Sequence, residues 1–170
     1  MTHPALFATI WAALALFVAG ELGKNGAGRN FLQKLRPAPS FFWWASACGL
    51  AIAASHIVIA LAINNDWNHA IAWRVTEERT REMFGFGWGG AVAANYAFLA
   101  YWAVDLWRWR TNPAGLAQQP ALLRWSSRVF VLGIIVPAAV VFAAGPRRWL
   151  GLLLVAALIA AWRPAHARDD

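Results

Sequence analysis

The chain has 170 residues, of which 60% are hydrophobic, and only 15 basic and 8 acidic side chains are available to form a polar surface. This composition excludes an ordinary soluble domain, because apolar residues in long blocks are typical of helices that cross a bilayer. The net charge of +7 would favour nucleic-acid binding in a soluble protein, but the basic residues lie in short stretches between apolar blocks, so we expect no nucleic-acid partner.

The apolar blocks predict an all-α fold, a polytopic integral membrane helix bundle that forms a single membrane domain over residues 1–170. A helix needs about 20 mostly apolar residues to cross the hydrocarbon core. Five transmembrane helices are expected, at about residues 5–22, 41–63, 87–107, 128–145 and 148–162. Because the last block is short, the alternative is four spans followed by a re-entrant or interfacial C-terminal segment. Pro137 predicts a kink in the fourth span.

The first block, residues 5–22, has a cleaved signal peptide as its alternative reading. No Lys or Arg precedes the block, and no clear pair of small residues marks a cleavage site after it. These features favour an uncleaved span that ends at Glu21 and Lys24.

The second block, residues 41–63, is uncharged apart from His56. Gly49 and Ala53 share a helical face with this histidine. Small residues at such spacing let two helices approach closely. We therefore predict that Gly49 and Ala53 are helix-packing residues. The single Cys48 lies in the same block and excludes an intrachain disulfide and a cysteine metal cluster.

An amphipathic, charged helix is predicted in the 64–84 loop. Asn64, Asn65 and Asp66 are residue types that favour the N-cap of a helix. Further along, Glu77 and Arg81 are four residues apart, a spacing that places opposite charges on one helical face.

The third block, residues 87–107, carries both small and polar residues. Gly85, Gly89 and Ala93 form a small-residue stripe and are predicted to pack against a neighbouring helix. Asn95 points to roughly the opposite side. Features on two faces predict that this helix is central in the bundle.

The basic residues predict the orientation of the chain. Residues 23–40, residues 108–128 and the C-terminal tail hold four, four and two Lys or Arg, whereas the N-terminus, the 64–86 segment and the turn at 147 hold none, three and two. Loops rich in Lys and Arg stay in the cytoplasm. We therefore expect a multi-pass protein of the cell (inner) membrane of a bacterium, with its N-terminus outside and its C-terminus in the cytoplasm.

His56, Asn95 and Tyr96 are the first candidates for a binding site. His56 and Tyr96 are expected at similar depth on antiparallel helices, and ionisable groups at membrane depth indicate function. The favoured interpretation is a neutral histidine that hydrogen-bonds between helices. The alternatives are a contact with a quinone, a lipid or a pigment, and a proton relay.

Glu21 and Asp105 are the second candidates, at the inner ends of the first and third blocks. Lys24 and Arg108 follow them by three residues, which predicts interfacial ion pairs. The alternative is a point where protons enter a relay.

No metal site is predicted. His69, Glu78 and Glu82 are the nearest approach to a ligand set, but the histidine is distant in sequence and arginines already balance the glutamates. We also find neither a Ser-His-Asp set nor an HExxH motif, so the pattern disfavours an enzyme, and no cofactor is identified.

Two functions remain. The first is a small accessory or structural subunit that packs within a larger membrane complex, with other membrane protein subunits and phospholipids as partners. The second is a small-ligand protein, transporter or enzyme that binds a quinone, lipid or pigment near His56, Asn95 and Tyr96. A homo-oligomer is the expected assembly in the second case.

Overall fold

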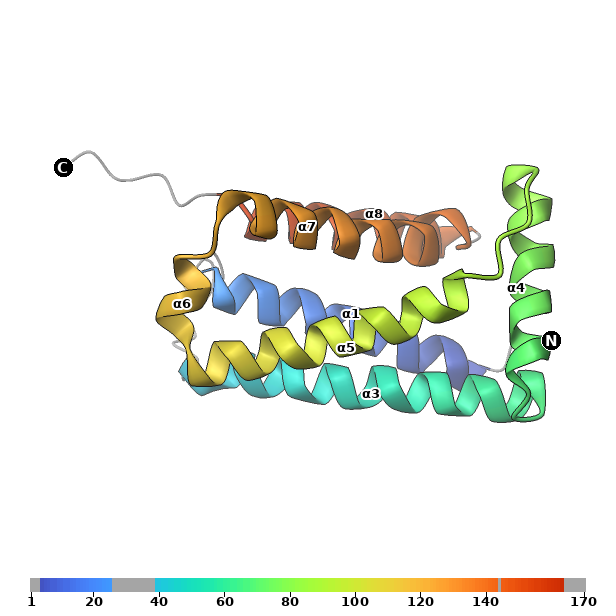
Figure 1. Ribbon diagram of the computed structural model, residues 1–170, viewed down its shortest axis with the longest axis horizontal. Helices are drawn as coiled ribbons and strands as arrows, with labels where there is room; N and C mark the ends of the chain where they lie inside the picture. The colour runs from blue at the N-terminus through green and yellow to red at the C-terminus, as the bar shows by residue number, and fades with distance from the viewer. Residues whose placement is uncertain (1–3, 26–38, 144, 164–170) are drawn as a thin grey trace.

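The structure is a computed structural model that describes residues 4–25, 39–143 and 145–163, and these residues form helices and no strand. Five helices lie along the long axis and alternate in direction (Figure 1): α1 (Pro4–Lys24), α3 (Pro39–Asn65), α5 (Ala91–Thr111), α7 (Ala121–Val136) and α8 (Pro146–Ala161). The shorter α4 (His69–Phe84) crosses one end of this bundle, and α6 (Pro113–Ala117) lies at the other. The all-helical prediction is confirmed.

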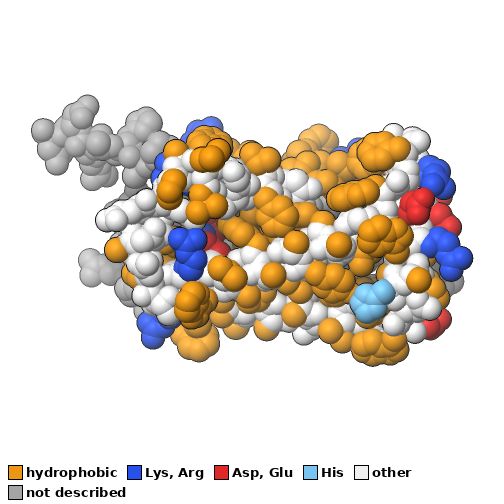
Figure 2. All heavy atoms as spheres, viewed as in Figure 1, with side chains coloured by type: hydrophobic (Ala, Val, Ile, Leu, Met, Phe, Trp, Pro, Cys, Tyr) orange, Lys and Arg blue, Asp and Glu red, His pale blue; other side chains and the backbone are white. Residues whose placement is uncertain are grey.

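Three segments among the described residues are long and apolar enough to cross a membrane: Leu6–Lys24, Ser40–Asn65 and Ala121–Val141. They support a membrane protein, but they are fewer than the five spans predicted. Polar and charged residues such as Asp105 and Arg108 lower the hydropathy of α5, and α8 has only 16 residues. In the view of Figure 2, hydrophobic side chains cover the middle of the molecule and charged ones lie toward its two ends.

Helices α5 and α7 extend beyond the apolar blocks that predicted them. The sequence indicated a loop from Arg108 to Arg128, yet α5 continues to Thr111 and α7 begins at Ala121. Arginine is a good helix former, so a helix need not end where its apolar block ends. The real connection is short, and in it Asn112 caps α6 by accepting a hydrogen bond from the Gly115 N–H at 2.8 Å.

The N-cap of α4 is Asn68, and none of the three polar residues at 64–66 has this role. Helix α3 continues through Asn65, and Asp66 and Trp67 then adopt positive φ angles of 47° and 59°. The Asn68 Oδ1 accepts hydrogen bonds from the N–H groups of Ala70, at 2.9 Å, and Ile71, at 3.3 Å. The predicted amphipathic helix is therefore present but begins at His69.

The segment from Gly85 to Gly90 folds back on α4 instead of starting α5. Gly85 ends α4 with φ 77°, a conformation that glycine adopts at little cost, and its N–H donates to the Arg81 carbonyl at 2.9 Å. The buried Thr80 hydroxyl accepts a hydrogen bond from the Trp88 N–H at 2.7 Å. Gly89 lies against the indole of Trp73, where a β-carbon would collide. Helix α5 therefore begins at Ala91, four residues later than predicted.

Pro137, the predicted kink, begins a π-helical turn, η1 (Pro137–Val141), that continues α7. Proline has no N–H to donate within a helix, and π-turns are one way in which helices absorb such a defect. Gly151 of α8 packs directly on the carbonyl of Ala139 in this turn, and no β-carbon would fit there. Helix α8 therefore packs directly against the backbone of this turn.

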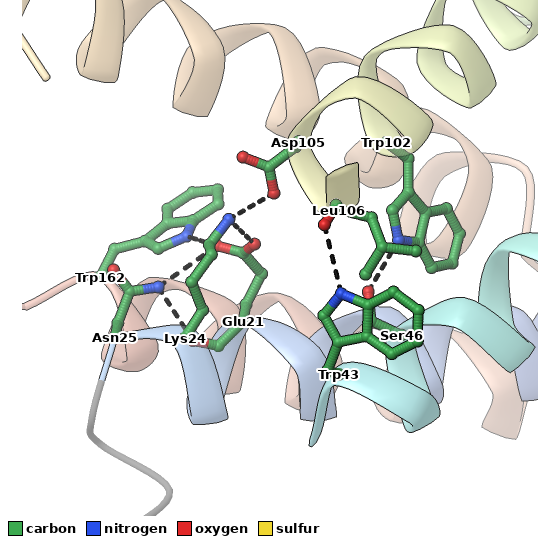
Figure 3. Close-up of polar contacts among 9 residues, drawn as sticks. All are labelled: Glu21, Lys24, Asn25, Trp43, Ser46, Trp102, Asp105, Leu106 and Trp162. Atoms are coloured by element: carbon green, nitrogen blue, oxygen red, sulfur yellow. Dashed lines mark hydrogen bonds and ion pairs between the residues drawn. The ribbon is translucent and has the colours of Figure 1, made fainter. Parts of the chain in front are cut away.

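The core lies where α1, α5, α7 and α8 meet. Its centre is formed by Phe17, Trp102, Ile135 and Leu158, none of them more than 2% exposed. Trp102 meets the Phe17 ring edge-on, with ring centroids 4.8 Å apart, and its indole N–H donates to the Ser46 hydroxyl at 2.9 Å (Figure 3). This bond joins α5 to α3 across a buried interface.

Candidate functional site

A groove lies between α4 and the adjoining ends of α1, α3 and α5, with a volume of about 700 Å³. His56, Asn95 and Tyr96 all line it, so the three predicted residues face one space. Much of the remaining wall is apolar: Leu6, Phe7, Ile10, Ile57, Ala60, Leu61, Ile63, Ala72, Val75 and Val92. The groove thus combines apolar walls with several polar or charged residues: His56, Asn64, Asn65, Thr76, Arg79, Asn95 and Tyr96.

His56 connects α3 to α1. Its Nδ1 lies 3.0 Å from the hydroxyl of Thr9, which itself lies 3.1 Å from the Leu6 carbonyl. If the hydroxyl donates to this carbonyl, its oxygen accepts from His56 Nδ1–H. The contact with Thr9 does not use Nε2. The His56 ring can therefore join two helices through Nδ1 and still present Nε2 to the groove.

Tyr96 pairs with His69 and not with His56. The Tyr96 hydroxyl lies 3.0 Å from His69 Nε2, and this contact ties α5 to the first residue of α4. Asn95 is exposed, and its side chain makes no hydrogen bond to any residue that the structure describes. Arg79 of α4 also lines the groove and is the one Lys, Arg, Asp or Glu among the described residues that line it.

Glu21, Lys24 and Asp105 form a second site near the opposite end of the bundle (Figure 3). Lys24 makes ion pairs with both carboxylates, Glu21 of its own helix and Asp105 of α5, the latter at 2.6 Å. The three side chains are only 10–15% exposed. Among the described residues no ion pair joins Asp105 to Arg108, so Lys24 takes the place that the sequence assigned to Arg108.

Trp162 and Asn25 complete the shell of Glu21. The Trp162 indole N–H donates to Glu21 Oε2 at 2.6 Å, and the Asn25 amide lies 3.3 Å from the same oxygen. Trp162 follows the last residue of α8, so Glu21 connects α1 to the end of α8, and Lys24 connects α1 to Asp105 of α5. A buried carboxylate is tolerated only when it is paired and hydrogen-bonded in this way.

The predicted packing residues fall into two groups. Gly49 and Ala53 are buried, and a β-carbon on Gly49 would meet Leu16 of α1 and Trp102 of α5. Gly85 instead caps α4 with open space around it, and Ala93 is exposed on α5. The stripe from Gly85 to Ala93 is therefore not a continuous helix face within this chain, because the Gly85–Gly90 segment is not helical.

The described residues contain no group of three or more His, Cys, Asp or Glu arranged to hold a metal ion. No protein-family model, curated protein or solved structure matches this chain.

Four partner residues were missed by the sequence reasoning: Thr9, Ser46, Thr80 and Trp162. Three of them bear hydroxyls: Thr9 and Ser46 lie within apolar blocks, and Thr80 lies in the charged helix at 64–84. A buried hydroxyl needs a partner. That signal was present in the sequence. The identity of each partner depends on helix rotation and depth, which the periodicity does not give.

Proposed function

We propose that this chain is an integral membrane protein that binds an amphipathic small molecule, of the quinone or lipid class, in the groove at His56, Asn95 and Tyr96. The observation that supports this proposal is the groove itself. Its volume of about 700 Å³ lies within the range of about 300–1,000 Å³ that is typical of small-molecule sites. Ten of its seventeen described lining residues are apolar, and the other seven are polar or charged, so apolar contacts and hydrogen-bonding groups lie in one space.

The arrangement of polar groups favours a ligand with one polar end. The amide of Asn95, the second ring nitrogen of His56 and the hydroxyl of Tyr96 offer donors and acceptors for a carbonyl or a hydroxyl. Ile10, Ile57 and Leu61 offer contacts to an apolar tail. A pigment would need more aromatic surface than these walls provide, so we favour a quinone or a lipid.

The test is purification in mild detergent followed by native mass spectrometry. We expect the wild-type chain to retain a small molecule. Asn95→Leu should weaken retention roughly 5- to 100-fold, because leaving one polar ligand group unpaired costs about 1–3 kcal/mol. Since Asn95 bonds to no described residue, thermal stability should not change. Gln118→Leu, the same kind of change at the other end of the bundle, is the control. Equal retention by both variants would reject the site.

A second candidate is an accessory subunit of a larger membrane complex, and one observation favours it. Ala93, Ala97 and Ala100 of α5 are all exposed and follow helical spacing. Small residues on an uncovered face allow another helix to approach closely. Subunits that co-purify in mild detergent would favour this function, whereas a lone chain or homo-oligomer with a bound small molecule favours the first.

We also propose that α5 and α8 cross the membrane, giving five spans. Both lie along the other three (Figure 1), and α5 contributes Trp102 to the shared core. Helix α8 is only about 24 Å long at 1.5 Å per residue, and Arg147, Arg148 and Arg163 could extend it by reaching toward the headgroups. The alternative remains four spans with a re-entrant or interfacial α8.

The expected topology places α4 outside a bacterial inner membrane and α6 in the cytoplasm, because the segments around α6 carry more Lys and Arg. In a Cys48→Ser background, a membrane-impermeant thiol reagent should label Glu78→Cys in intact cells and spare Gln118→Cys. Both positions are exposed. The reverse pattern would invert the orientation. Equal labelling would contradict the proposal that α5, the helix between the two positions, crosses the membrane.

A further inference from the structure

A second, smaller cavity lies beside the ion-paired cluster, at the end of the bundle that carries α6. Its volume is about 160 Å³, several times the roughly 30 Å³ that one water takes in the liquid. It has room for a group the size of a phosphate but not for a whole lipid. Side chains from α1, α5 and α7 line it, together with residues of the α5–α7 connection.

The charged groups that line this cavity do not cancel. Among the described residues they comprise two carboxylates, Glu21 and Asp105, and three cations, Lys24, Arg124 and Arg128. Both carboxylates are already engaged by Lys24. No ion pair within the described part of the chain includes Arg124 or Arg128. One positive charge is therefore in excess, and the arginines of α7 present it.

Arg128 is held in place although no described carboxylate forms an ion pair with it. Its guanidinium lies over the rings of Trp125 and Trp162, 5.4 Å and 5.5 Å from their centroids. Stacking of this kind fixes the planar group and leaves N–H donors at its edge. Arg124 lies one helical turn away on the same helix, and the hydroxyls of Tyr101 and Ser127 also line the cavity.

We infer that this cavity binds a phosphate group, and that the source is the headgroup of an anionic phospholipid. Paired arginines with nearby hydroxyls are the donors that recognise phosphate oxygens. Basic pockets between helices at a membrane surface are suited to anionic headgroups, whose acyl chains stay in the bilayer. This site is separate from the groove and does not depend on the function proposed for it.

The test compares lipid binding by the full chain in mild detergent, measured by native mass spectrometry with phosphatidylglycerol, with phosphatidylcholine and with inorganic phosphate. We expect the wild type to bind phosphatidylglycerol preferentially. Arg124→Gln should weaken that binding about fivefold, which corresponds to about 1 kcal/mol per basic residue at an anionic surface. Arg124 is exposed, so this variant should fold normally. Arg124→Gln with Arg128→Gln should weaken binding further.

Arg147→Gln is the matched control, because Arg147 also stacks on an aromatic ring, that of Phe7, but does not line the cavity. Because Arg147 lies outside the cavity, this variant should weaken binding much less than Arg124→Gln does. If inorganic phosphate binds with the same dependence on Arg124 and phosphatidylglycerol does not, the phosphate site stands and its source is a free phosphate. If neither binds, or if Arg124→Gln and Arg147→Gln have equal effects, the inference is wrong.

Discussion

Replacement of Lys24 by methionine is expected to lower the free energy of unfolding by about 3–5 kcal/mol, the usual cost of removing one partner of a buried ion pair. Lys24 is the shared cation of Glu21 and Asp105, and all three side chains are at most 15% exposed. Without it, two carboxylates stay buried beside each other. Unfolding in mixed micelles with increasing dodecyl sulfate measures the change.

The exposed pair Glu77–Arg81 is the control for this prediction. Arg81 is 60% exposed and Glu77 37% exposed, so Arg81→Ala should change stability by no more than about 1 kcal/mol. The triple variant Glu21→Gln, Lys24→Met, Asp105→Asn should recover part of the loss, because no unpaired charge remains. If Lys24→Met unfolds like the wild type, the three residues do not form a buried cluster.

Trp102→Ala is expected to destabilise the chain by about 3–5 kcal/mol, the range for large aromatic residues truncated in a core. Trp102 is 1% exposed, contacts Phe17 and Phe98, and donates to Ser46. Truncation leaves a cavity at the junction of α1, α3 and α5 and removes the partner of a buried hydroxyl. The same micelle titration measures the effect.

Trp107→Ala is the matched change on the same helix, since this tryptophan is 65% exposed. We expect it to alter stability by less than about 0.5 kcal/mol, as is usual for surface positions. Equal losses from the two variants would mean that α5 does not turn Trp102 toward the core and Trp107 away from it.

The sequence predicted the helices well and their ends less well. Long apolar blocks are a strong signal, so α1 and α3 were anticipated, and cap residues and charge spacing indicated the helix at 64–84. The starts of α5 and α7 were not anticipated. Gly87, Gly89 and Gly90 extended the apolar block of α5 toward the N-terminus, and Arg124 and Arg128 interrupted the apolar block of α7. In the structure, Thr80 and Trp73 hold the glycines against α4, and the arginines lie within helices.

The sequence predicted which residues belong to the candidate sites, but it did not predict most of the contacts that they make. Lys24 was expected to pair with Glu21, which is three residues away, and this pair is present. Its second pair, with Asp105, joins residues 81 positions apart. Likewise His56 was expected to bond between helices, but its partner Thr9 could not be identified. Contacts of this kind depend on which helices are neighbours, and one-dimensional patterns do not encode that.

The two sites occupy opposite ends of the bundle and differ in character. Among the described lining residues, the groove has one Lys, Arg, Asp or Glu, which is Arg79, and ten apolar residues, whereas the small cavity has five charged side chains. A ligand tail would suit the first and a phosphate the second. The proposed function requires that the groove binds a ligand.

Photo-crosslinking in the membrane tests that claim most directly. A photoreactive amino acid replaces Ala60, which lines the groove, or Val58, which lies two residues away on α3 and is 51% exposed. We predict that the chain crosslinked through position 60 gains the mass of one defined lipid or quinone, while position 58 yields only a mixture of bulk lipids. A crosslink from position 60 to another protein chain, or the same lipid mixture from both positions, would contradict the account.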